Sequence, residues 1–78
     1  MITRVTFSEH ARKRMLKRSI TAKEVKLVIM QPDHFNIAKF GCYEAFKRIG
    51  GKNIKAVYEL RNTHHAHVVT VKKAGISL

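Results

Sequence analysis

The spacing of apolar residues changes at Pro32, and this change constrains the fold more than any other feature of the sequence. Before Pro32 the apolar residues recur at helical intervals, whereas after it apolar and polar residues alternate as they do in strands. Short turn sequences separate the later segments, so consecutive strands should pair as an antiparallel meander. The sequence therefore predicts a single α+β domain over residues 1–78, with two N-terminal helices packed on one face of a three- or four-stranded antiparallel sheet.

The helix boundaries are predicted from capping residues. A first helix is expected over residues 9–18, because Ser8 is a favoured N-cap. A second helix should begin after Thr21, which has the spacing of a capping box with Glu24, and should stop before Pro32. The alternating residues 1–6 predict either a short lead-in strand or an ordered arm.

The strands are expected near residues 34–37, 42–49, 54–61 and 65–72, with turns at Gly50-Gly51 and Asn62-Thr63. The helices should cover the side that carries Tyr43, Ala45, Ile49, Ile54, Ala56, Tyr58 and Leu60, and only Lys47 interrupts the apolar character of this side. The opposite side should stay open, and it carries Glu44, Phe46, Arg48, Lys55, Val57, Glu59 and Arg61. If both turns have even length, the last strand adds to this open side Ala66, Val68, Thr70 and Lys72.

The charge balance indicates a polyanionic partner. Sixteen Lys and Arg against five Asp and Glu give a net charge of +11, which would attract RNA, DNA, an anionic membrane surface or an acidic protein. No stretch approaches the roughly 20 apolar residues of a membrane span, and polar Thr3 and Arg4 interrupt any signal-peptide core. Cys42 is the only cysteine, so no internal disulfide can form, and a cytoplasmic location is expected.

The first helix carries the most suggestive pattern of charge. One of its faces presents a single imidazole among four cations, namely His10, Lys13, Arg14, Lys17 and Arg18. Ala11 and Met15 lie beside this face and should contact the core. The basic face is either a solvated helix surface with an incidental histidine or a functional site.

The run from His10 to Ile20 resembles the opening motif H-A-x-x-R-M-x-x-R-x-I of a small prokaryotic family known as a domain of unknown function. The match continues through the helix that ends at Pro32, the Gly50-Gly51 turn and the strand around Thr70. Such proteins look like distant relatives of the RelE/ParE toxins, within the barnase, colicin and RelE ribonuclease group. The resemblance implies a RelE-like fold with RNA cleavage or binding, action on the ribosome, and an acidic antitoxin as partner.

With what the resemblance implies, these residues predict a toxin-like RNA endonuclease that cleaves through the 2′-hydroxyl without a metal ion or other cofactor. A base must take the 2′-hydroxyl proton, cations must stabilise the phosphorane, and an acid must protonate the leaving 5′-oxygen. His10 is the expected proton carrier, and Arg14 would hold the phosphate bidentately. Arg48 would add positive charge, and Thr70 would donate a hydrogen bond or orient His10.

Further residues are expected to bind RNA, either by charge or by stacking. They are Lys13, Lys17, Arg18, Phe46, Lys47, Lys55, Arg61 and Lys72. Phe46 would stack a base or simply contact Val57 across the strands. Glu44 and Glu59 would serve as a general base or pair with neighbouring cations.

Other functions remain open at this stage. The same charges fit a non-catalytic RNA-binding module, and exposed Leu27 and Met30 on the second helix would suit a protein partner or a homodimer. A zinc site built from His64, His65 and His67 is disfavoured, because Cys42 has no obvious partner set. His65 and His67 should share one side of their strand.

Overall fold

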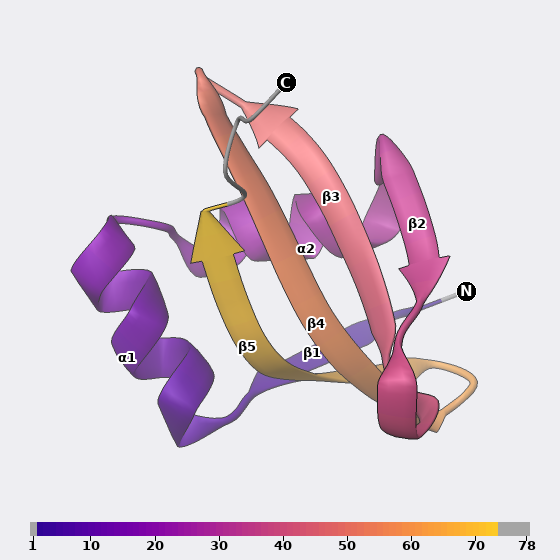
Figure 1. The fold of residues 1–78 in the computed structure, drawn as a ribbon. Helices are drawn as coiled ribbons and strands as arrows, with labels where there is room; N and C mark the ends of the chain where they lie inside the picture. Colours follow the sequence, from indigo (N-terminus) through magenta and orange to yellow (C-terminus); the bar gives the residue numbers. More distant parts are fainter. Residues whose placement is uncertain (1, 74–78) are drawn as a thin grey trace.

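The computed structural model describes residues 2–73, which form two helices packed against one face of a five-stranded sheet (Figure 1). The elements in chain order are β1 (Arg4–Phe7), α1 (Glu9–Arg18), α2 (Ala22–Met30), β2 (His34–Ile37), the 3-10 turn η1 (Lys39–Gly41), β3 (Tyr43–Ile49), β4 (Lys52–Asn62) and β5 (His65–Lys73). The strand order across the sheet is β1-β5-β4-β3-β2. The predicted α+β class is therefore confirmed.

The predicted number of strands and the purely antiparallel sheet are wrong, because β1 joins the sheet as a fifth strand. It pairs in parallel with β5, at the opposite edge from β2. The backbone N–H groups of Thr3 and Arg4 donate to the carbonyl of His64 at 2.8 and 3.0 Å, and that of Ser8 donates to Val68 at 2.9 Å. Because β1 and β5 are far apart in the sequence, no short turn motif predicts their pairing.

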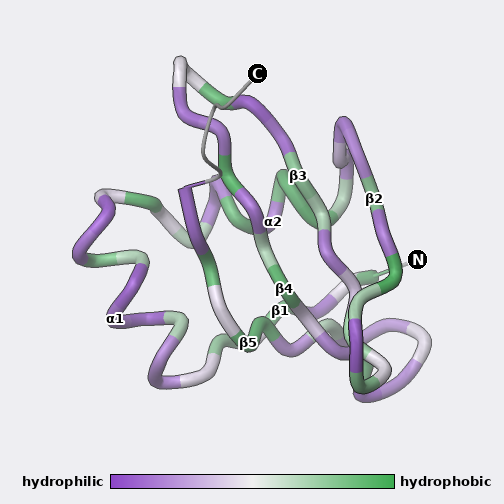
Figure 2. Tube along the Cα trace, in the orientation of Figure 1, coloured by the Kyte–Doolittle hydropathy of each residue, from purple (hydrophilic) through white to green (hydrophobic). Residues whose placement is uncertain are grey.

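The predicted caps are all present and fix where the helices begin. The Ser8 side chain accepts a hydrogen bond from the Ala11 N–H at 3.0 Å. Thr21 and Glu24 form a reciprocal capping box at 2.9 and 3.1 Å. In Figure 2, hydrophilic and hydrophobic stretches alternate along α1, as expected for a helix with one face in the core.

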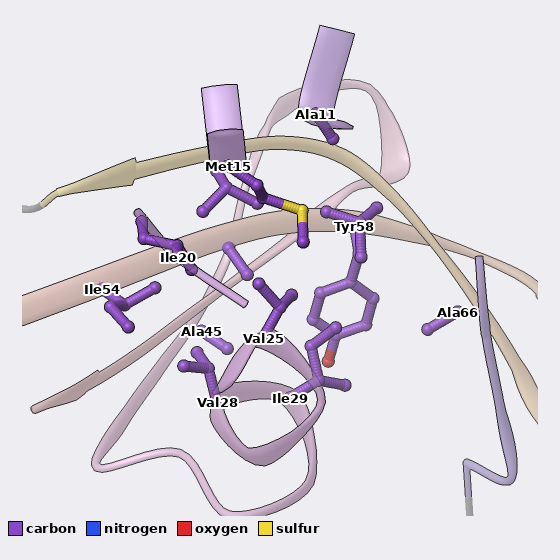
Figure 3. Packing of buried hydrophobic residues seen from close by; sticks show 13 residues of the cluster. Ala11, Met15, Ile20, Val25, Val28, Ile29, Ala45, Ile54, Tyr58 and Ala66 are labelled. Carbon is purple, nitrogen blue, oxygen red and sulfur yellow. The ribbon is translucent and has the colours of Figure 1, made fainter. Parts of the chain in front are cut away.

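Both helices contribute to one hydrophobic core on the covered face of the sheet. Figure 3 shows Met15 from α1 and Val25 and Ile29 from α2 near the Tyr58 ring of β4. Among residues 2–73, the buried members of this core are Ala11, Met15, Ile20, Val25, Val28, Ile29, Ala45, Ile54, Ala56, Tyr58, Ala66, Val68 and Val71. The core lies entirely on one side, so the other face of the sheet is left uncovered by helices (Figure 1).

The prediction that Ala66 and Val68 lie on the open face is wrong, whereas Thr70 does face that side. The register passes from Val57↔Thr70 to Tyr58↔Val68, so Val69 is left without a partner as in a β-bulge. The extra residue reverses the alternation within β5 and buries Ala66 and Val68 completely.

The two hairpin turns were predicted with different success. Gly50-Gly51 forms the β3–β4 turn, and both residues have positive φ, at 56° and 83°, which glycine adopts without strain. The β4–β5 turn consists of Thr63 and His64, one residue later than predicted. Leu60 has the predicted covered-side parity but remains 42% exposed.

Candidate functional site

Most of the cations in the described chain lack a carboxylate partner. Four of the five acidic residues are already paired: Lys47–Asp33 at 3.4 Å, Lys52–Glu24 at 3.0 Å, Lys55–Glu44 at 3.1 Å and Arg61–Glu59 at 3.0 Å. Twelve of the sixteen Lys and Arg residues form no ion pair with a side chain of residues 2–73. This excess charge is what a polyanion would meet at the surface.

The basic face of α1 is accessible to solvent, but no hydrogen bonds among the described residues hold its side chains in a fixed arrangement. His10, Lys13, Lys17 and Arg18 are exposed, and Arg14 is half-buried. Helix α1 packs mainly against β5 and lies on the β1–β5 side of the sheet (Figure 1). In the described residues no hydrogen bond or ion pair joins His10 to Arg14, or either residue to Arg48 or Thr70. The predicted catalytic set is therefore not held together by direct contacts.

The open face of the sheet carries several of the predicted RNA-binding side chains. Arg48 and Lys72 are exposed there. Lys55 forms its ion pair with Glu44 and also lies 5.6 Å from the centre of the Phe46 ring. A base could stack on Phe46 only after the Lys55 ammonium moves aside.

Lys47 lies on the helix-covered side of the sheet, apart from its neighbours Phe46 and Arg48. Its ammonium group contacts the Asp33 carboxylate. That carboxylate also accepts a hydrogen bond from the Arg48 backbone N–H at 3.0 Å. The Arg48 N–H contributes most to lowering the pKa of Asp33, and Lys47 adds to the effect. Lys47 thus stabilises the start of β2 rather than extending the open cationic face.

Thr70 projects from the open face opposite Val57. Its hydroxyl oxygen is buried and has no hydrogen-bond partner in the described part of the chain. An unsatisfied buried hydroxyl is uncommon in folded proteins and retains its capacity to donate. Among the described residues no hydrogen bond joins this hydroxyl to His10, so the predicted orienting role is not seen in the structure.

One cluster on the open face was missed by the sequence analysis. The Thr6 hydroxyl lies 2.8 Å from Nε2 of His65 and 2.8 Å from Nδ1 of His67. The parallel register places Arg4 beside His65 and Thr6 beside His67. Desolvation lowers the pKa of His65, and the positive charges of Arg4 and Arg61 lower it further, followed by that of His67.

Two signals in the sequence bear on this cluster. The alternation of His65 and His67 correctly predicts that they share one side of β5. The third member could not be predicted, because Thr6 reaches them only through the β1–β5 pairing. The polar alternation of residues 1–6 marked a strand, but it gave no partner for it.

An open apolar hollow adjoins this face at the β2–β3 connection. Its lining includes Ile37, Phe40, Val57 and Val69, together with Glu44 and the half-buried Cys42 thiol. Phe40 is 97% exposed. The predicted exposure of Leu27 and Met30 on α2 is confirmed at 38% and 50%.

The described residues offer no cluster suited to a metal ion. Within residues 2–73, no three His, Cys, Asp or Glu side chains converge as potential ligands. In the same range, neither helix has the length and apolar character needed to cross a membrane.

Comparison with known protein families gave a family whose sequence model matches most of the chain. Residues 7–73 match the model of a family described as a domain of unknown function, DUF4258. The match covers both helices and β2 to β5. Comparison with curated proteins and with solved structures gave no match. The chain therefore belongs to the DUF4258 family.

Proposed function

We propose that this protein binds RNA across its cationic surface and cleaves it as a toxin-like, metal-independent endonuclease. The observation that carries the proposal is the set of twelve cations without a carboxylate partner among residues 2–73. Two of them, Arg48 and Lys72, are exposed on the uncovered sheet face, which also bears imidazole and hydroxyl groups. Cations of this kind bind phosphates, and the neutral side chains among them supply proton transfer.

Cleavage through the 2′-hydroxyl suits the groups available. The 2′-oxygen attacks the adjacent phosphorus, the bond to the 5′-oxygen breaks, and the products are a 2′,3′-cyclic phosphate and a 5′-hydroxyl. This reaction requires proton transfer and charge stabilisation but no external oxidant, reductant or metal ion. Exposed His10 and the Arg14 guanidinium, one helical turn further on, remain the candidates on α1 for these two roles.

A toxin of this type would require an inhibitor in its own cell. The unpaired cations make an acidic antitoxin protein the expected inhibitor, because it would compete directly with RNA phosphates for the same charges. Translated RNA on the ribosome is the proposed substrate in the cytoplasm. Growth arrest on induced expression, relieved by His10→Ala, would support both the toxicity and the role of His10.

The direct experiment is cleavage of a labelled RNA by the purified protein in the presence of EDTA. We expect products that end in a 2′,3′-cyclic phosphate and no cleavage of the matching DNA, which lacks the attacking hydroxyl. Cleavage that requires added metal, or cleavage of the DNA, would contradict the proposed chemistry.

A non-catalytic RNA-binding module is the second candidate. The observation that favours it is the absence of any hydrogen bond, among the described residues, that orients the His10 ring. In that case RNA affinity would fall steeply with salt concentration, while no product would accumulate.

A further inference from the structure

The cluster of Thr6, His65 and His67 has a hydrogen-bond pattern that restricts where its protons can be. A single hydroxyl oxygen lies 2.8 Å from one ring nitrogen of each histidine, Nε2 of His65 and Nδ1 of His67. A hydroxyl donates one hydrogen and can accept others. Both contacts are satisfied with neutral imidazoles in two ways: Thr6 accepts from the N–H of both rings, or it donates to one ring and accepts from the N–H of the other.

The second arrangement, in which Thr6 donates to one ring, couples the tautomers of the two rings. If Thr6 donates to Nε2 of His65, that ring carries its hydrogen on Nδ1, and His67 must also carry its hydrogen on Nδ1 in order to donate to Thr6. If Thr6 donates to His67 instead, both rings carry their hydrogen on Nε2. In either arrangement, one of the two ring nitrogens that Thr6 does not contact is a base, and the other bears a proton.

We propose that His65, Thr6 and His67 form the proton-transfer centre for cleavage of RNA phosphodiesters on the open face, with the two histidines as catalytic residues and Thr6 as a positioning residue. This inference rests on the proposed function and assigns its acid and base to β5 rather than to His10 on α1. The open side of β5 is also where Thr70 and Lys72 project, so substrate bound there would meet positive charge.

The proton balance of one turnover follows from the coupling. Starting with both hydrogens on Nδ1, the free Nε2 of His67 takes the proton of the 2′-hydroxyl, and the 2′-oxygen forms its bond to phosphorus. The bond from phosphorus to the 5′-oxygen breaks, and that oxygen takes the proton from Nδ1 of His65. His67 passes its Nδ1 proton to Thr6, and Thr6 passes its own to Nε2 of His65. Both rings end with their hydrogen on Nε2, and proton exchange with water restores the starting state.

The surroundings of His65 favour the neutral form that this scheme uses. The charged and titratable groups around the pair are Arg4 on β1, Glu59 and Arg61 on β4, and His64 in the β4–β5 turn. Arg4 and Arg61 oppose a positive charge on His65. Glu59 lies opposite His67 in the register, but its carboxylate is paired with Arg61 at 3.0 Å.

A purely structural role for the cluster is the competing explanation, because the same hydrogen bonds fasten β1 to β5. The two roles differ in what substitutions of the histidines do to cleavage. We expect His65→Ala and His67→Ala each to lower the cleavage rate about 100-fold or more, the usual range for loss of a general acid or base. RNA affinity should change less than about twofold, because neutral rings add little to phosphate binding.

Two histidines elsewhere provide matched controls. His34 is exposed at the far edge of the sheet, on β2, so His34→Ala should cleave at the wild-type rate. His10→Ala tests the alternative assignment directly. Cleavage that survives in both His65→Ala and His67→Ala but is lost in His10→Ala would overturn the proton-transfer centre and leave the proposed function standing. Lack of cleavage by the wild-type protein would overturn both.

Substitutions of Thr6 separate positioning from packing. Thr6→Val keeps the side-chain shape and removes the hydroxyl, whereas Thr6→Ser keeps the hydroxyl. We expect cleavage to be lost in the valine variant and retained in the serine variant, at a temperature where both are shown to be folded. Equal cleavage by the two variants would overturn the role of the hydroxyl.

A spectroscopic measurement completes the test without relying on activity. Long-range nitrogen–proton NMR correlations report which ring nitrogen carries the hydrogen. We expect the His65 and His67 rings to populate the same tautomer in the wild-type protein and to lose this match in Thr6→Val. Opposite tautomers in the wild type would overturn the proposal.

The pH dependence gives a final distinction. Because both rings work as neutral groups, the cleavage rate measured from about pH 5 to 8.5 should rise with pH and then stay constant. A bell-shaped profile in this range would show that one ring acts as a charged imidazolium, and would overturn the neutral scheme.

Discussion

At the scale of single residues, the Thr70 hydroxyl stands out because it is buried without a hydrogen-bond partner in the described chain. Replacing an unsatisfied hydroxyl by a methyl group of similar shape removes its desolvation cost. We therefore expect Thr70→Val to raise the free energy of unfolding by about 1 kcal/mol, measured by urea denaturation.

The same variant bears on the catalytic prediction for Thr70. If its hydroxyl donates to the reacting phosphate, Thr70→Val will be more stable than the wild type but will cleave RNA more slowly. A less stable Thr70→Val protein would show that the hydroxyl has a partner in solution. Unchanged cleavage would remove Thr70 from the catalytic set.

The residues of α1 show what the sequence predicts well. The burial of Ala11 and Met15 and the exposure of His10 follow from a helical period of 3.6 residues, which depends only on near neighbours. The positions of Ala66 and Val68 could not be predicted in this way, because the unpaired Val69 reverses the alternation. Periodicity predicts faces only as far as the next bulge.

At the scale of secondary-structure elements, the capping box of α2 is tied to the sheet by a lysine. The Lys52 ammonium group donates to the Ser19 carbonyl and to the Glu24 carboxylate, both at 3.0 Å. We expect Thr21→Ala to lower the free energy of unfolding by about 1 kcal/mol, because it leaves an N-terminal N–H of the helix without its acceptor. Thermal or chemical unfolding would measure this, with the exposed Lys26→Ala on α2 as a neutral control.

The start of β2 should make stability depend on acid. The Arg48 N–H, and then Lys47, lower the pKa of Asp33, so the folded state favours the carboxylate. This contribution is complete above the ordinary aspartate pKa and is lost as the pH falls through the folded-state value. We expect the melting temperature of the wild-type protein to fall on acidification below about pH 4. The Asp33→Asn protein should be less stable at pH 7, and its melting temperature should fall less steeply with acid. An identical dependence of the melting temperature on acid pH in the two proteins would contradict this account.

The elements themselves were predictable to different degrees. Both helices, their caps and the Gly50-Gly51 turn are encoded in short stretches, and the sequence predicts them correctly. Strand β1 has only four residues, and its partner β5 lies far away in the sequence. Neither the parallel pairing nor the Thr6 contacts that depend on it could therefore be predicted.

At the scale of the whole molecule, the distribution of charge predicts how RNA binding depends on salt. The logarithm of the association constant should fall linearly with the logarithm of salt concentration, by about 0.7 for each phosphate of a single strand that is neutralised. Arg48 and Lys72 are both exposed on the open face, so the double variant Arg48→Ala/Lys72→Ala should reduce this slope by about 1.4.

The matched control for this measurement lies on the other side of the molecule. Lys23 and Lys26 are exposed on α2, which packs against the covered face of β3 and β4. Lys23→Ala/Lys26→Ala makes the same change in net charge and should leave the slope nearly unchanged. If the two double variants shift the slope equally, RNA is not bound preferentially on the open face.

The pairing of β1 with β5 also sets an order of events during synthesis. Thr6 is separated by 59 and 61 residues along the chain from the two imidazoles that it contacts. A nascent chain therefore emerges with the hydroxyl first, and the strand that receives it is translated later. On the proposed assignment, the proton-transfer centre is incomplete until β5 has been translated and has paired with β1.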